Sequence, residues 1–200
     1  MLVATDSVES FFHGVVEDAI KAKRVAATDG ATSYLVALLT DYARPGNRAE
    51  EALARPMAFL LDEAMHTPSP AERFERLRSL GDGVLYSCGF FGDHFEARGV
   101  DQGYLIGIGS IAYGAASSML RVPNEEKQPD IYRELADKFA SFVAVLMEIA
   151  DASIAQGVAG SRDLVKVYER WLRTGSDRLA QALTSHGFMP TRGGGKGVLQ

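Results

Sequence analysis

The chain has 200 residues, of which 46% are hydrophobic and 24% charged, a balance that supports a buried core and excludes disordered and fibrous classes. With 26 acidic against 21 basic residues the net charge is −5, so we expect no nucleic-acid partner. The single cysteine excludes an internal disulfide framework and a multi-cysteine metal cluster. The first residues lack the basic region of a secretory signal, which predicts a cytoplasmic protein.

Two amphipathic helices are predicted at the start of the chain. Apolar residues recur at steps of three and four over about 7–25, and again over about 31–43. The intervening break at 28–30 contains glycine, and the segment 43–47 has the composition of a turn.

The next two predicted helices are delimited by proline. A helical stretch over 49–66 is interrupted at Pro56, which lacks an N–H and clashes with the preceding turn, so we expect a new helix to begin near it. A further helix is predicted over 70–98, because proline at its first turn is favourable and apolar residues repeat at helical spacing throughout.

The stretch 102–120 carries no formal charge. Its glycines and serines, and the lack of a basic cluster beside it, favour a buried central helix of a helical bundle over a membrane span. A polar connection at 121–130 leads to a single helix predicted over about 131–155.

A last helical region is predicted over 161–186, with a break at 174–176, and the glycine-rich segment 189–200 is predicted to be a flexible tail. No segment alternates as a strand. The sequence therefore predicts an all-α, single-domain bundle of about seven or eight helices over residues 1–188. This arrangement is typical of bacterial helical proteins.

Glycines in the central helix permit two interpretations. The segment 107–112, Gly-Ile-Gly-Ser-Ile-Ala, matches a dinucleotide-binding fingerprint, but it lacks the preceding strand and the βαβ context that this chemistry needs. A stripe of small residues fits better and predicts close packing against another helix, or else a ligand or partner helix lying there. Its members are Gly103, Gly107, Ser110, Gly114 and Ser117.

A metal site is the next candidate. Glu63 and His66 form an E-x-x-H pair on a predicted helix, as in di-iron bundles, and Glu148 and Asp151 are the candidate further acids. The pair does not occur a second time, so we expect no metal and no other cofactor, and Glu63 with His66 remain the alternative.

A nucleophilic site has little support. Cys88 and His94 lie six residues apart, which places them on different turns of one helix. Cys88 within an apolar stripe is expected to be a small core residue, and His94 is expected at the solvated end of its helix.

Aromatic residues give the preferred candidate surface, because tyrosine combines an apolar ring with a polar tip and suits interfaces. Tyr86, Phe90, Phe91, Tyr104 and Tyr113 are expected to cluster around the glycine-rich helices. The predicted ligand- or partner-binding residues are Tyr86, Cys88, Phe91, His94, Tyr104, Gly107 and Tyr113.

Together these observations predict a non-catalytic protein-interaction or regulatory domain whose partner is another protein or, by self-association, a second copy of the chain, with neither nucleic acid nor membrane. The alternative is a helical bundle that binds a small apolar ligand or a metal, with or without enzymatic activity. An exposed apolar patch would favour the first class, and a closed pocket beside the glycine stripe the second.

Overall fold

The computed structural model describes residues 3–44, 55–120, 130–157, 161–188 and 190. Of these residues 84% are helical, and none of them lies in a strand. The all-α class predicted from the helical periodicity is therefore confirmed. All of the predicted tail at 189–200 except residue 190, most of the polar connection at 121–130, and residues 45–54 lie outside the described residues.

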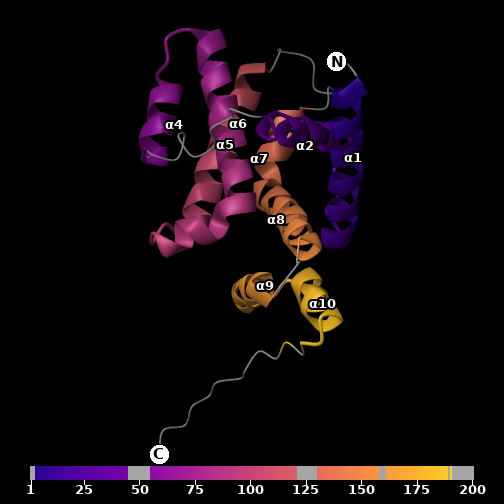
Figure 1. The fold of residues 1–200 in the computed structure, drawn as a ribbon. Helices are drawn as coiled ribbons and strands as arrows, with labels where there is room; N and C mark the ends of the chain where they lie inside the picture. The colour runs from indigo at the N-terminus through magenta and orange to yellow at the C-terminus, as the bar shows by residue number, and fades with distance from the viewer. Residues whose placement is uncertain (1–2, 45–54, 121–129, 158–160, 189, 191–200) are drawn as a thin grey trace, which may run out of the picture. The chain divides into compact units, whose positions relative to one another are not determined.

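Nine helices make up the described part of the chain (Figure 1). They are α1 (Val3–Lys23), α2 (Asp29–Tyr42), α4 (Met57–Met65), α5 (Pro70–Ala97), α6 (Gln102–Leu120), α7 (Ile131–Asp137), α8 (Phe139–Gln156), α9 (Ser161–Thr174) and α10 (Asp177–Ser185).

Contacts divide the chain into two compact units, Met1–Met147 and Glu148–Gln200. Compactness alone does not make a unit an independent domain, so the single domain over residues 1–188 stays a prediction. The first unit holds α1 to α7 and the beginning of α8, and the second holds the end of α8 with α9 and α10.

In the first unit, α5 and α6 lie side by side and form its centre (Figure 1). Helix α4 contacts both of them, α7 packs on α6, and α2 contacts α1, α5 and α7. Local signals start these helices as the sequence predicts. Pro70 occupies the first turn of α5, where its missing N–H costs nothing, and Ser69 caps that helix by accepting from the Glu72 N–H.

Three glycines allow close packing in this unit. A Cβ on Gly81 would lie 2.5 Å from the Tyr113 ring, one on Gly109 would overlap the Phe139 ring, and one on Gly89 would overlap Leu146. In each case a large side chain from another helix fills the space that the missing Cβ leaves. Of these three glycines, Gly109 is on α6 but lies outside the small-residue stripe predicted for that helix.

The single helix predicted over 131–155 is interrupted. Lys138 has φ −111° and ψ 20°, which ends α7, and α8 begins at the next residue. The apolar spacing passes through this point unchanged, since Leu135, Phe139 and Phe142 are all buried. The interruption places the Lys138 ammonium 2.6 Å from the Ala26 carbonyl oxygen, a contact distant in sequence.

The second unit has its own small core. Trp171 and Val167 of α9 pack with Leu179 and Leu183 of α10. Two ion pairs lie beside it: Arg170 Nε lies 2.6 Å from Asp151 Oδ1, and Arg178 Nε lies 3.0 Å from Glu148 Oε1.

Two described helices, α6 and α8, are long and apolar enough to cross a bilayer by length and composition alone. This is weak evidence for a membrane span, because a core helix of a soluble protein has the same properties.

Candidate functional site

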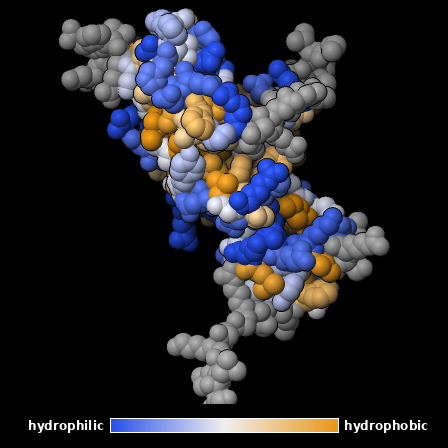
Figure 2. All heavy atoms as spheres, turned by 90° about the vertical axis from the view of Figure 1, so that its left-hand side faces the viewer, coloured by the Kyte–Doolittle hydropathy of each residue, from blue (hydrophilic) through white to orange (hydrophobic). Residues whose placement is uncertain are grey.

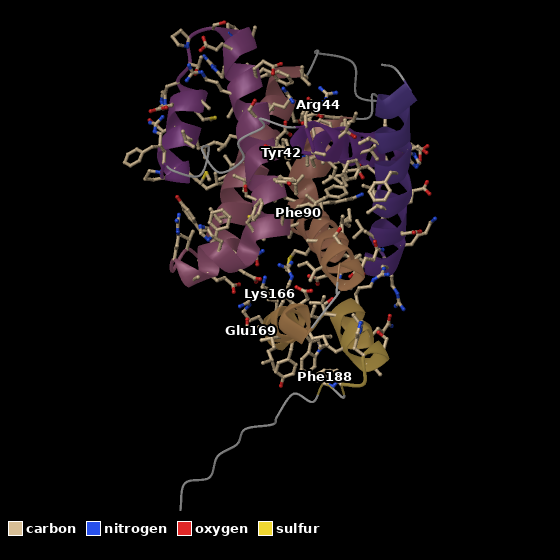
Figure 3. All side chains as sticks on the ribbon, in the orientation of Figure 1. Tyr42, Arg44, Phe90, Lys166, Glu169 and Phe188 are labelled. Atoms are coloured by element: carbon tan, nitrogen blue, oxygen red, sulfur yellow. The ribbon has the colours of Figure 1, made fainter. Side chains whose placement is uncertain are left out.

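The predicted aromatic surface divides into separate places. The Tyr86 ring stacks on Tyr42 of α2 with centroids 4.1 Å apart, and on Phe90 at 4.8 Å. The edge of Phe91 meets Tyr86 at 5.9 Å. Figure 3 labels Tyr42 and Phe90, which come from α2 and α5. Thus Tyr86, Phe90 and Phe91 lie together as predicted. Tyr42 of α2 also belongs to this group and was not predicted from the sequence.

Phe91 marks a bend in α5. Its φ of −124° and ψ of 21° are not helical, and its side chain is 38% exposed. Beyond the bend, His94, Glu96 and Arg98 are exposed, as predicted for the solvated end of this helix, whereas Phe95 is buried.

Tyr113 belongs instead to a buried cluster centred on Asp82. The hydroxyls of Tyr34 and Tyr113 donate to Asp82 Oδ1 at 2.6 and 2.7 Å. Arg78 Nη1 donates to Asp82 Oδ2 at 2.9 Å. The cluster therefore joins α2, α5 and α6 through one carboxylate, and the edge of the Tyr132 ring from α7 packs on Tyr34.

Burial governs the ionisation of this cluster. It raises the pKa of Asp82, while the hydrogen bonds from Tyr34 and Tyr113 and the charge of Arg78 act in the opposite direction. Burial, together with the Asp82 carboxylate, also raises the pKa of both tyrosines. The tyrosines are thus neutral hydrogen-bond donors, and each oxygen of Asp82 already accepts from a side chain of this chain. Such an arrangement fixes helices in place rather than presenting a reactive group.

Asp82 was not among the residues predicted from the sequence. Its position borders the apolar arc of α5, four residues after Arg78, where a carboxylate ordinarily reaches water. Asp82 is covered by Tyr34 and Tyr113, which lie 48 and 31 residues away in the sequence. Helical periodicity does not predict contacts between residues so far apart.

The candidate metal ligands have other partners. Arg55 Nη1 donates to Glu63 Oε2 at 3.0 Å, and His66 Nδ1 lies 3.2 Å from Asp62 Oδ1. Glu148 and Asp151 pair with arginines in the second unit. Within the described ranges, no three His, Cys, Asp or Glu side chains are placed to hold a metal ion.

Cys88 lies in the core, as expected. Its side chain is fully buried, and burial raises the pKa of the thiol to about 12. Because the thiolate is the nucleophilic form and burial disfavours it here, this cysteine is a poor nucleophile.

The prediction that the small-residue stripe on α6 is buried against another helix is wrong. Gly103 is exposed, and a Cβ on Gly107 would meet nothing within 4 Å. Only Ser117 of the stripe is buried; its hydroxyl donates to Asp130, while the half-buried Ser110 donates to the Ala136 carbonyl. The reason is that α6 packs through a neighbouring arc of its surface, formed by Leu105, Ile108, Gly109, Ala112, Tyr113, Ala116 and Ser117.

The opposite arc of α6 contains no charged residue, and four of its six residues are exposed. At 3.6 residues per turn, its six residues fall within about 100° of the helix circumference. Tyr104 is 46% and Ile111 54% exposed. We call this arc the outward face of α6; it comprises Gly103, Tyr104, Gly107, Ile111, Gly114 and Ser118.

Comparisons with protein-family models, with curated proteins and with solved structures find no match to this chain.

Proposed function

We propose that this chain is a non-catalytic protein-interaction domain and that the outward face of α6 is its contact surface. The observation that supports this most directly is the combination of exposed Tyr104 and Ile111 with glycines on a helix without any charged residue. Exposed apolar residues that share one helix face are typical of an interaction site, whereas single exposed apolar residues are ordinary.

Small residues on this face suit the approach of another helix. Gly107 has open space where its side chain would be, so a partner backbone can come closer there than it can to a larger residue. The Asp101 carboxylate caps the start of α6 beside Gly103, but from Gly107 to Ser118 the face carries no charged residue, so a helix that docks on that part buries no ion of this chain.

Other exposed apolar residues in the first unit have charged neighbours. Helix α4 exposes Phe59 and Met65 but also carries Asp62 and Glu63. On the face that α4 presents, apolar residues are interspersed with hydrophilic ones (Figure 2). The uncharged arc of α6 is therefore the better candidate for a specific contact.

The Asp82 cluster gives a second reason to favour binding over catalysis. Both of its carboxylate oxygens accept hydrogen bonds from side chains of the chain itself, and its tyrosine hydroxyls donate to it. A general acid or base must instead reach a substrate within hydrogen-bond distance. We therefore assign the cluster a structural role.

Photo-crosslinking tests the proposal. Benzoylphenylalanine placed at Ile111 should crosslink to a polypeptide in cells that make the protein, and Gly107→Leu should abolish the adduct without lowering the melting temperature. The same photoprobe at Phe59, which is 63% exposed, is the matched control and should give no adduct. Failure to crosslink from Ile111, or equal crosslinking from both positions, would contradict the proposal.

A further inference from the structure

We draw no further inference here: the strongest candidate, the surface patch that the exposed side chains of Val165, Tyr168 and Leu172 form on α9, carries no proposal because exposed residues of both signs of charge lie on the same helix and nothing in the structure shows what covers the patch.

Discussion

Alanine substitution at Gly107 and Gly109 distinguishes the outward face of α6 from its buried face. Both glycines lie in the interior of one helix, so both variants gain the same helix propensity, about 1 kcal/mol relative to glycine. At Gly107 a Cβ meets nothing within 4 Å, and the gain is expected in full. A stabilisation of 1 kcal/mol raises the melting temperature of a chain of this size by about 2–4 °C.

At Gly109 the same Cβ would lie 2.6 and 2.8 Å from Phe139 Cε2 and Cε1. Phe139 is only 2% exposed, so its ring has no free space to enter. Overpacking of this kind costs about 1–3 kcal/mol. Because these contacts are so short, we expect a cost near the upper end of that range. Subtracting the propensity gain of about 1 kcal/mol leaves a net loss of about 2 kcal/mol for Gly109→Ala.

Thermal and urea unfolding followed by circular dichroism measure both variants. Two protein concentrations are needed, because self-association makes the melting temperature depend on concentration. The expected result is a rise for Gly107→Ala and a fall for Gly109→Ala. If Gly109→Ala is as stable as the parent, the packing argument is refuted. If Gly107→Ala destabilises the monomer, the outward face is covered and the proposed function loses its main observation.

Further predictions concern the buried groups and the candidate metal ligands. Asp82→Ala should cost about 3 kcal/mol in urea unfolding, since it leaves Tyr34 and Tyr113 without acceptors; a loss below that of a surface mutation would show that water replaces the carboxylate. The raised pKa of Asp82 in the folded chain means that its contribution to stability is full below about pH 4 and declines as the pH rises through the folded pKa. The stability of the parent relative to Asp82→Asn should therefore fall with rising pH, and a rise would show that the carboxylate is favoured in the ionised form. The buried Cys88 should resist alkylation until the chain unfolds, and rapid labelling of native protein would contradict its burial. Elemental analysis should find no stoichiometric iron, zinc or manganese; metal that is lost in His66→Ala would reverse the preference for an interaction domain.

Periodicity and proline predicted the helices well, because both act within a few residues. Pro56 stands directly before the start of α4, and the break at 174–176 separates α9 from α10. The break at Lys138 was not predictable in this way, since apolar residues keep their spacing across it. Its contacts come from Ala26, more than a hundred residues earlier.

The covered face of α6 was not predictable for a different reason. An amphipathic helix shows its buried side by contrast with charged residues on the other side. Residues 102–120 contain no charged residue, so nothing in the pattern distinguished Gly107 from Gly109. Only the position of Phe139 decides which of them is enclosed.

The Asp82 cluster required the tertiary fold as well. Its hydrogen bonds from Tyr34 and Tyr113 join residues 48 and 31 positions apart in the sequence, so the local pattern around Asp82 indicated only a charged residue near Arg78. The stacked contact of Tyr42 with Tyr86 likewise joins α2 to α5.

The location of the single tryptophan has a practical consequence for spectroscopy. Trp171 belongs to the small core of the second unit, whereas every tyrosine except Tyr168 lies in the first. Tryptophan emission excited at its red edge therefore reports the second unit alone, while near-ultraviolet dichroism from the tyrosines is dominated by the first. Denaturation curves from the two signals coincide if the units unfold together and separate if they do not. The native chain thus carries an intrinsic probe of cooperativity that needs no label.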